Sequence, residues 1–577
     1  MNSMQQPVRI VLLGINSQYV HSALAPWCLK AGLKAYAKTA HQAQVVEGTV
    51  NEPPARVLQR VAEAAPQVLG ICCYIWNISY VETLLPQLRA ALPHCVIVLG
   101  GPEVSHRAAD VLARYAQVEY VISGEGELPF ARLVDALAGQ GALKDVPGLC
   151  YRADDGLHIS TPHQHETMQP SPCLEEYIAA LDGRIAYLET SRGCPYACAF
   201  CLSGRGETLR HAPMERAQQE ILQLAQSGAQ TIKLVDRTFN ADRSRARALL
   251  AFMAEEYGRG IPKDVCFHFE IAGDLLDEAT LALVNAAPRG LFQFEIGLQS
   301  MHESTLRRVR RHTDMEHLKK QVRTLIAGGR AHVHLDLIAG LPGETLADFA
   351  RGFDAAYALR PHALQLGFLK LIHGSAMREQ PEQYPCTFDP APPYQVQSTP
   401  AMSEKDFAVL TIAERALDKL HNSGRFVRTL RFLTDDTRCA PFELFLMLGQ
   451  AISDAEKQAR KGSLSLDELT NTVYDALTTA YPEHAALLRD LMLQDRLSST
   501  VTTVLPRSLK RRDTRFHPVK RALNERFPRT GDAPRAIGFL YAGDADSVVW
   551  CDYENKDPVT GLYPLHEMRV QECLGRG

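Results

Sequence analysis

Apolar runs and amphipathic stretches alternate regularly over the first 140 residues of the chain. The apolar runs are short and have few polar interruptions, which is typical of parallel strands buried on both faces of a sheet. They are Val8–Gly14, Val45–Val46, Val68–Tyr74, Cys95–Leu99 and Tyr120–Ile122. Segments with helical spacing lie between them. This alternation predicts a doubly wound, Rossmann-like α/β domain over residues 1–140.

Glycine, aromatic and polar residues follow the predicted strands of this domain. In an open α/β sheet, ligands bind at the carboxyl ends of the strands. The candidate binding residues at this edge are Gln18, His21, Trp76, Gly100, Gly101, Glu103, Gly124 and Glu125. The loops lack Gly-x-Gly-x-x-Gly spacing, which disfavours a nicotinamide cofactor. A second interpretation is a scaffold domain whose glycines only make tight turns.

The pattern of apolar positions divides the remaining chain into three parts. Residues 141–180 are polar and contain prolines, which predicts a connector with one short strand. Residues 181–372 repeat strand and helix six times, which predicts a partial (β/α)6 barrel rather than a full barrel of eight units. Residues 373–577 predict a mainly helical domain, with Ser403 as a helix N-cap and a β-hairpin near the end.

Six apolar runs define the predicted barrel strands. They are Ile185–Thr190, Thr231–Val235, Val265–Ile271, Leu291–Ile296, His332–Ile338 and Ala363–Leu369. Barrels of this kind carry their active residues at the carboxyl ends of the strands. The candidates there are Glu270, Glu295, Gln299 and Asp336, with Gly340 and Pro342 in the loop after the fifth strand. The carboxylates either hold a polar ligand or form internal ion pairs with arginine.

Three cysteines, Cys194, Cys198 and Cys201, follow the first predicted barrel strand. Cysteine thiolate is the usual ligand of a cluster of four irons and four sulfides. Three thiolates would leave one iron open for a substrate or cofactor. Closely spaced cysteines also bind zinc, which takes four ligands in structural sites, and the next cysteine is the distant Cys266. The spacing favours the iron–sulfur cluster and leaves zinc as the alternative.

An aromatic residue, Phe200, stands directly before the third cysteine, and the motif then resembles the signature of the radical S-adenosylmethionine (SAM) enzymes. The segments GGPEVS and GEGE resemble the cobalamin-binding domain that precedes the barrel in one large class of these enzymes. The region after the barrel is similar to an uncharacterised helical extension found in the same class. The resemblance covers roughly Val8–Leu371 and extends loosely beyond it.

The resemblance implies a set of cofactors and residues that would hold them. A [4Fe-4S] cluster is implied on the three cysteines, and cobalamin at the eight strand-end candidates of residues 1–140. The Asp-x-His-x-x-Gly motif that offers histidine to cobalt is absent, so no protein histidine on cobalt is implied. The Gly-Gly-Glu that often binds SAM is replaced by Val235-Asp236-Arg237. The implied SAM contacts are Phe200, Glu270, Glu295, Gln299, Asp336, Gly340 and Pro342.

The resemblance also implies the reaction. One electron from a flavodoxin or ferredoxin would cleave SAM into methionine and a 5′-deoxyadenosyl radical, for methyl transfer to, or rearrangement at, an unactivated carbon. One rival is a tRNA-modifying methylthiotransferase, which needs a second cluster on three cysteines of the N-terminal domain. Cys28, Cys72, Cys73 and Cys95 are poorly placed for it. The other rival is a non-catalytic iron–sulfur protein that binds nucleic acid.

Bulk composition narrows the classes of partner. The chain has 577 residues, 46% hydrophobic and 22% charged, with a formal net charge of -4, so its overall charge does not indicate a nucleic-acid partner. Lys510–Arg529 is locally basic with interleaved aromatic residues; we interpret it first as a solvated surface and second as a phosphate-binding one. Apolar runs are too short for a membrane span. The polar N-terminus and fourteen cysteines predict a reducing, cytoplasmic location.

Overall fold

The structure, a computed structural model, describes residues 6–203, 208–529, 531–542 and 546–575. The chain forms two compact units that do not follow a single cut in the sequence. The first comprises Met1–Glu295, Ser304–Asp314 and Phe368–Pro400, and the second comprises Ile296–Glu303, Met315–Gly367 and Ala401–Gly577. Each unit is described by itself.

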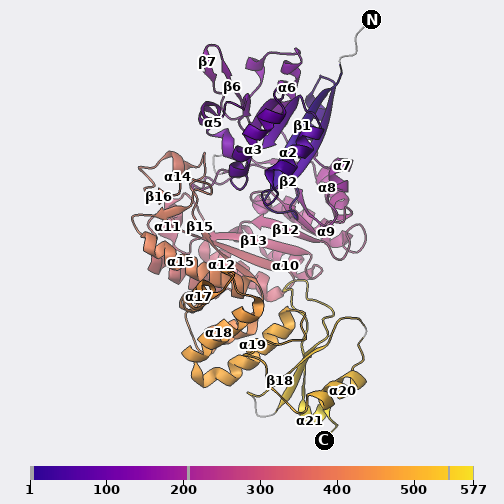
Figure 1. Cartoon of the computed structure of the whole chain (residues 1–577), viewed down its shortest axis with the longest axis vertical. Helices are drawn as coiled ribbons and strands as arrows, with labels where there is room; N and C mark the ends of the chain where they lie inside the picture. Colours follow the sequence, from indigo (N-terminus) through magenta and orange to yellow (C-terminus); the bar gives the residue numbers. More distant parts are fainter. Residues whose placement is uncertain (1–5, 204–207, 530, 543–545, 576–577) are drawn as a thin grey trace. The chain divides into compact units, whose positions relative to one another are not determined.

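The N-terminal part of the first unit is the predicted doubly wound domain (Figure 1). Its sheet has the strand order β2-β1-β3-β4-β5-β6-β7. The strands are β1 (Val8–Asn16), β2 (His41–Thr49), β3 (Val68–Cys72), β4 (Val96–Gly100), β5 (Tyr120–Ile122), β6 (Leu149–Ala153) and β7 (Gly156–His158). The helices are α1 (Leu24–Tyr36), α2 (Pro54–Glu63), α3 (Ile78–Ala91), α4 (Pro102–Ser105), α5 (Ala108–Arg114) and α6 (Glu127–Leu137). The strands from β2 to β5 are parallel, as predicted.

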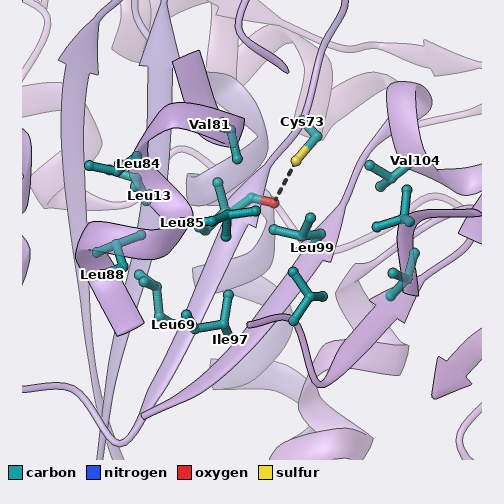
Figure 2. Packing of buried hydrophobic residues seen from close by; sticks show 14 of the residues in the cluster. Leu13, Leu69, Cys73, Val81, Leu84, Leu85, Leu88, Ile97, Leu99 and Val104 are labelled. Carbon is teal, nitrogen blue, oxygen red and sulfur yellow. Dashed lines mark hydrogen bonds between the residues drawn. The ribbon is translucent and has the colours of Figure 1, made fainter. Parts of the chain in front are cut away.

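Successive residues of β1 pack into different cores, which is why this strand is apolar throughout. Val11 and Leu13 join a cluster with residues of α2, α3 and α5, part of which is drawn in Figure 2. Ile10 and Leu12 join a second cluster with residues of α1 and α6. Because side chains of a strand alternate between the two faces of its sheet, helices on both faces bury the whole run.

Two elements of this domain differ from the sequence prediction. β2 runs from His41 to Thr49, well beyond the expected Val45–Val46, because it is the edge strand and has polar residues on its exposed positions. The expected connector contributes β6 and β7, which extend the sheet with antiparallel pairing. The short strand predicted within residues 141–180 is therefore β6, and it belongs to the sheet of the N-terminal domain.

The six predicted barrel strands are all present among the described residues, with the order β15-β14-β13-β12-β11-β8. They are β8 (Ile185–Leu188), β11 (Thr231–Leu234), β12 (Cys266–Ile271), β13 (Phe292–Gln299), β14 (His332–Ala339) and β15 (Ala363–Phe368). The helices that accompany them are α7 (Glu175–Ala179), α8 (Met214–Ala225), α9 (Arg243–Glu256), α10 (Glu278–Ala286), α11 (Glu303–Arg308), α12 (Met315–Gly328) and α13 (Leu346–Tyr357). The partial (β/α)6 barrel is confirmed.

The region after the barrel is mainly helical and ends in a small sheet. It contains α14 (Ala376–Glu379), α15 (Glu404–Leu417), α16 (Val427–Asp435), α17 (Pro441–Gln458), α18 (Leu466–Ala480), α19 (Ala485–Ser499), α20 (Phe516–Arg526) and α21 (Val570–Cys573). Its strands are β16 (Thr387–Phe388), β17 (Val396–Ser398), β18 (Ala536–Leu540), β19 (Ser547–Cys551) and β20 (His566–Arg569). Ser403 caps α15 in a capping box with Asp406, as predicted. The expected hairpin is β18 and β19, to which β20 adds a third antiparallel strand.

Candidate functional site

The three cysteines lie in a loop whose two ends are paired with each other. β9 (Ser191–Arg192) enters the loop, and β10 (Arg210–His211) leaves it, in antiparallel register with Arg210 opposite Arg192. Gly193 turns the chain between Arg192 and Cys194 with φ of 98°. A Cβ there would lie 2.6 Å from the carbonyl oxygen of Thr208, so the turn requires glycine. We call residues 193–209 the cysteine loop.

The thiols of the cysteine loop are largely shielded from water and have polar neighbours. Cys194 and Cys198 are buried and Cys201 is half-buried. The Cys194 sulfur lies 3.6 Å from the Thr238 hydroxyl, and the Arg311 guanidinium donates to the Cys198 sulfur at 3.9 Å. Burial raises the pKa of the Cys198 thiol, and the charge of Arg311 opposes that rise. A cation beside the sulfurs suits thiolate ligands.

The described side chains include no group of three His, Cys, Asp or Glu that converges on one metal ion. A four-iron cluster spreads its thiolates over separate irons, so it does not need such a convergence. The backbone of the loop is anchored near the second cysteine. The amide of Ala199 donates to the carbonyl of Val309 at 2.9 Å, and the carbonyl of Ala199 accepts from the amide of Met377 at 3.0 Å. Phe200 follows directly and is half-buried. The cysteine chemistry and the fixed backbone fit a cluster better than a structural zinc site.

Asp236, in the segment Val235-Asp236-Arg237 after β11, has a structural role. Asp236 is buried, and its carboxylate accepts from the amide and the hydroxyl of Thr190 at 2.7 and 2.5 Å and from the Ser191 hydroxyl at 2.8 Å. Burial raises its pKa to about 6, although these hydrogen bonds oppose the rise. Asp236 therefore fixes the turn that leads from β8 into the cysteine loop.

Large apolar side chains are exposed after β1 and β3, at the carboxyl edge of the N-terminal sheet. Tyr19 is 76% exposed and Trp76 is 50% exposed. Trp76 stacks on Tyr74 with 4.3 Å between ring centroids, and its indole donates to the Ile15 carbonyl at 3.2 Å. Gln18 lies in the same loop as Tyr19. Exposed apolar side chains at such an edge fit a large, partly apolar ligand such as cobalamin.

His21 contacts the barrel rather than standing free. Its Nδ1 lies 2.6 Å from the Tyr187 hydroxyl on β8, and its backbone forms a parallel bridge with Ile185. Burial, Lys233 and Arg184 lower the pKa of its imidazole. Arg184 also binds Glu47 of β2 at 2.7 Å. These partners could not be predicted from the sequence, because each pair joins residues far apart along the chain.

Glu103 is buried in the short helix α4, which follows β4, and is held by two partners. Arg107 binds it at 2.8 Å, and the Tyr394 hydroxyl donates to the same carboxylate. The guanidinium of Arg378 lies 4.6 Å from the centre of the Tyr394 ring. Gly100 and Gly101 precede this site, and a Cβ on Gly101 would lie 2.5 Å from the Cys73 carbonyl oxygen. Tyr394 ends the proline-rich segment PAPPY, whose function was not predicted.

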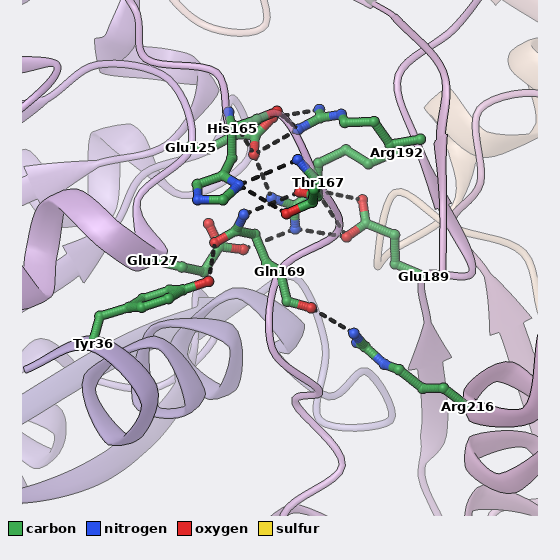
Figure 3. A network of polar contacts seen from close by, with 10 residues as sticks. Tyr36, Glu125, Glu127, His165, Thr167, Gln169, Glu189, Arg192 and Arg216 are labelled. Carbon is green, nitrogen blue, oxygen red and sulfur yellow. Dashed lines mark hydrogen bonds and ion pairs between the residues drawn. The ribbon is translucent and has the colours of Figure 1, made fainter. Parts of the chain in front are cut away.

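Glu125 and Glu127 of the GEGE segment are part of an ion-pair network with the base of the cysteine loop (Figure 3). Arg192 binds Glu125 at 3.2 Å, Glu127 at 2.8 Å and Glu189 at 2.6 Å. Gly124, before Glu125, has φ of 89° and forms a bridge with His163. Arg192 binds one carboxylate oxygen of Glu125 and Arg210 binds the other. A cobalamin contact through this side chain stays a prediction.

Glu270 and Glu295, the SAM candidates of the first unit, share a cation. Lys233 lies 3.9 Å from Glu270 and 3.2 Å from Glu295, and His268 lies 2.8 Å from Glu295. Burial raises the pKa of Glu270 despite the nearby charges of Arg237 and Lys233. The internal ion pairs expected as the alternative therefore exist, with lysine in place of arginine.

The SAM candidates of the second unit lie at the ends of β13 and β14. Gln299 has φ of 67° and Gly340 has φ of 92°, so the chain turns sharply at both strand ends. Asp336 on β14 lies 3.2 Å from His334. Pro342 precedes Glu344, whose carboxylate accepts from the Ser300 hydroxyl at 2.5 Å. Ser300 follows Gln299 directly, so Glu344 connects the two turns.

Comparisons with known proteins identify the domains of the chain. The family model "B12 binding domain" matches residues 10–134, "Radical SAM superfamily" matches residues 188–355, and "Protein of unknown function (DUF4080)" matches residues 382–532. These matches confirm the expected cobalamin-binding domain, radical SAM domain and uncharacterised C-terminal region. The exact domain boundaries stay a prediction.

Proteins similar to this chain include two curated methyltransferases and a solved structure. The 2-(S-pantetheinyl)-carbapenam-3-carboxylate methyltransferase of Streptantibioticus cattleyicolor is 30% identical over 56% of this chain and 50% of its own length. The cobalamin-dependent radical SAM methyltransferase TokK of Streptomyces tokunonensis is 25% identical over 66% of this chain and 59% of its own. The chain thus spans 50% and 59% of the lengths of these two relatives.

The structure of the cobalamin-dependent S-adenosylmethionine radical enzyme OxsB, with aqua-cobalamin and S-adenosylmethionine bound, matches with a TM-score of 0.59. It is 14% identical and the match covers 85% of this chain and 79% of that one. At this identity the likeness concerns the fold. No described helix of our chain is both long and apolar enough to cross a membrane.

Proposed function

The chain carries a B12-binding domain followed by a domain of the radical SAM superfamily, and from that premise we propose that it is a cobalamin-dependent radical SAM enzyme. The reaction proposed is methyl transfer to an unactivated carbon, in line with the relatives named methyltransferases. The observation that carries the proposal is the loop with Cys194, Cys198 and Cys201, which directly follows the first strand of the parallel sheet.

In this proposal the three cysteines hold a [4Fe-4S] cluster. The cluster, SAM and cobalamin together supply one-electron cleavage of a sulfonium bond and a transferable methyl group. The chain positions the cysteines. Val309 and Met377 fix the backbone beside Cys198. Asp236 fixes the turn before the cysteine loop, and Arg311 balances the charge of the thiolates. Burial of Cys194 and Cys198 restricts water at the same place.

Cobalamin is proposed at the carboxyl edge of the N-terminal sheet. The exposed Tyr19, Val20 and Trp76 supply apolar surface there. Gly100 has room beside its Cα, because the nearest atom of the described residues would lie 3.8 Å from an added Cβ. His21 is hydrogen-bonded to Tyr187, which supports the expectation that it does not bind cobalt. Phe200, Glu270, Glu295, Gln299, Asp336, Gly340 and Pro342 stay proposed SAM contacts.

We also propose an electron donor and a compartment. Reductive cleavage needs a low-potential electron, for which a flavodoxin or ferredoxin is the proposed source. All fourteen cysteines are free thiols in the structure, which suits the reducing cytoplasm proposed as the location.

The rival of a methylthiotransferase would need a second cluster on cysteines of the N-terminal domain. Cys72 and Cys73 are buried at the end of β3, and burial raises the pKa of Cys72 to about 12. Cys28 lies within α1 and Cys95 directly precedes β4. These cysteines lie on separate elements, and two of them are adjacent in the chain, so they are poorly placed to share one cluster, and the cobalamin-dependent reaction is favoured.

The rival of a non-catalytic nucleic-acid-binding protein would depend on the basic segment 510–529. Its Arg515 binds Asp513 and Asp546 at 2.6 and 2.5 Å, and Arg511 lies 4.3 Å from the centre of the Tyr541 ring. Both arginines therefore contact other residues of the C-terminal domain. The segment is therefore proposed as a structural, solvated surface.

The experiment is anaerobic reconstitution of the chain with iron, sulfide and hydroxocobalamin, followed by metal analysis. We expect about four irons and one cobalt per chain, and loss of iron with retained cobalt after simultaneous Cys194→Ala, Cys198→Ala and Cys201→Ala. Cys439→Ala, at a half-buried cysteine of the second unit, is the control and should keep both metals. Equal iron in the triple variant and the parent would refute the cluster assignment.

A further inference from the structure

Two arginines stand opposite each other where the cysteine loop begins and ends. Arg192 is the last residue of β9 and Arg210 is the first of β10, and their Cα atoms are partners in the antiparallel ladder. Their side chains are only 17% and 8% exposed. Like charges directly opposite each other in a ladder repel. This pairing is therefore stable only if an anion lies between the two guanidinium groups.

Glu125 of the N-terminal domain is that anion. Its Oε1 binds Arg210 Nη2 at 2.5 Å, and its Oε2 lies 3.1 Å from Arg210 Nη1 and 3.2 Å from Arg192 Nη1. The backbone amide of His165 adds a further contact at 3.4 Å. One carboxylate therefore holds both ends of the loop, from outside the radical SAM domain.

The network around Glu125 is balanced so that its carboxylate stays charged. Arg192 is also bound by Glu127 and Glu189 (Figure 3), and Arg210 donates to the His165 carbonyl. Burial raises the pKa of Glu125, but hydrogen bonds from Arg210 and the charges of both arginines outweigh it and lower the pKa overall. Breaking a buried pair of this kind is costly because the partner charges stay buried.

The backbone presents Glu125 in a fixed orientation. The amide of Glu125 donates to the His163 carbonyl at 2.8 Å, and the amide of Gly124 donates to the Ser105 hydroxyl at 3.2 Å. A Cβ on Gly124 would lie 2.1 Å from the His163 carbonyl oxygen. This close approach leaves Glu125 little freedom to leave the two arginines. Gly124 itself is one of the residues proposed to border cobalamin.

We propose that Glu125 is a positioning residue through which the cobalamin-binding domain closes the base of the cluster-binding loop. The role of the loop rests on the proposed function; the ion pairs do not. Glu125 then acts on the cluster through Arg192 and Arg210, without touching it, and a perturbation of the Gly124 segment reaches the cysteines by the same route.

The test measures hydrogen exchange in anaerobically purified protein, in peptides covering residues 194–203 and 208–212. Glu125→Gln keeps the shape of the side chain and removes its charge. We expect exchange in both peptides to rise about tenfold or more, because the buried arginines lose their common anion. Glu52→Gln is the matched control, since Glu52 pairs with Arg60 at 2.8 Å in the same domain, and it should leave both peptides unchanged.

A second variant, in which the charge of an arginine is removed together with that of Glu125, distinguishes a positioning role of Glu125 from a general loss of structure. In Glu125→Gln/Arg210→Gln the opposed cations are reduced to one, which Glu127 and Glu189 still neutralise. We expect exchange to return to within about twofold of the parent. In reconstituted protein, Glu125→Gln should also shift the cluster reduction potential to a less negative value, and the double variant should reverse that shift, because cluster potentials follow nearby charge.

Unchanged exchange in Glu125→Gln, or an equal rise in Glu52→Gln, would overturn the proposal. If Glu125→Gln does not fold, the double variant carries the test: a folded double variant with parent-like exchange supports the proposal, and one that also fails to fold overturns it. If the exchange results hold but no variant or parent binds iron, the ion-pair role stands and the proposed function fails. The two claims are therefore tested separately.

Discussion

Glu125 in the first unit and Glu344 in the second are both shielded carboxylates, and the chain treats them in opposite ways. Glu125 lies between two arginines, and its pKa is lowered. Glu344 is 1% exposed and has one donor, the Ser300 hydroxyl, while its Oε2 has no partner among the described residues. Burial raises the pKa of Glu344 to about 7.

The difference shows that burial alone does not decide the charge of a carboxylate. A cation within hydrogen-bond distance favours the anion, and its absence favours the neutral acid. Glu125 can therefore serve as a permanent anion between cations. Glu344 is suited to a neutral hydrogen bond between two turns, and it gains charge only near neutral pH. Four predictions test this contrast.

Removing a cation from the Glu125 network should have the largest effect. Arg192→Met leaves Glu125, Glu127 and Glu189 with one buried partner fewer, and we expect a loss of about 3–5 kcal/mol in unfolding free energy. Thermal denaturation of the apo protein measures it. Arg56→Met, at an exposed position on α2, should change stability by less than about 0.5 kcal/mol. Equal losses of unfolding free energy in both variants would show that the buried Arg192 network stabilises the fold no more than an exposed arginine does.

Glu344→Gln should flatten the pH dependence of stability. Burial raises the folded-state pKa of Glu344 from 4.5 to about 7, so the unfolded chain releases this proton first as pH rises. The contribution is complete below about pH 4.5 and is lost progressively up to about pH 7, a change of roughly 3 kcal/mol at most. Calorimetry at both ends of this range, on parent and variant, measures it. If the stability of the parent relative to the Glu344→Gln variant were greater at about pH 7 than at about pH 4.5, the assignment would be contradicted.

Tyr394→Phe should have a smaller effect, because Glu103 loses one partner and keeps another. The Tyr394 hydroxyl donates to Glu103, while Arg107 stays bound to it at 2.8 Å. We expect a loss of about 1–3 kcal/mol. Tyr151→Phe is the control, because the Tyr151 hydroxyl makes no hydrogen bond within the described residues. A loss in the control as large as in Tyr394→Phe would attribute the effect to the ring and not to the hydrogen bond.

Glu52→Gln should have the smallest effect of the four. Its pair with Arg60 is partly exposed, with side chains 27% and 40% accessible, and such pairs contribute less than about 1 kcal/mol. Chemical denaturation of parent and variant at low and high salt checks it. A loss comparable to that of Arg192→Met would remove the contrast between buried and exposed pairs.

Local patterns in the sequence predicted most elements of the fold. β1 and the other central strands were found because both faces are buried and the whole run is apolar. β2 was placed too short because an edge strand alternates with polar residues. β6 and β7 were assigned to a connector because only their pairing with β5 makes them part of the sheet. Ser403 was found because its capping box with Asp406 spans three residues.

Only the part of the candidate site that lies in a short sequence motif could be predicted. The three cysteines stand together in the sequence, and their spacing indicated a cluster. Tyr394 and Glu103 are 291 residues apart, and Arg210 and Glu125 are 85 apart. No periodicity connects such pairs, since tertiary packing alone brings them together. Glu125 is among the predicted strand-end residues, and its proposed contact with cobalamin stays a prediction, but the sequence does not indicate its arginine partners.

The central claim is that the three cysteines support reductive cleavage of SAM. The most direct measurement incubates reconstituted protein with SAM and a low-potential reductant under anaerobic conditions and quantifies 5′-deoxyadenosine and methionine by mass spectrometry. We expect both products from the parent and neither above background from the Cys194→Ala/Cys198→Ala/Cys201→Ala variant. Product formation by the triple variant at the parent's rate, or no product from a parent that carries its full iron content, would contradict the account.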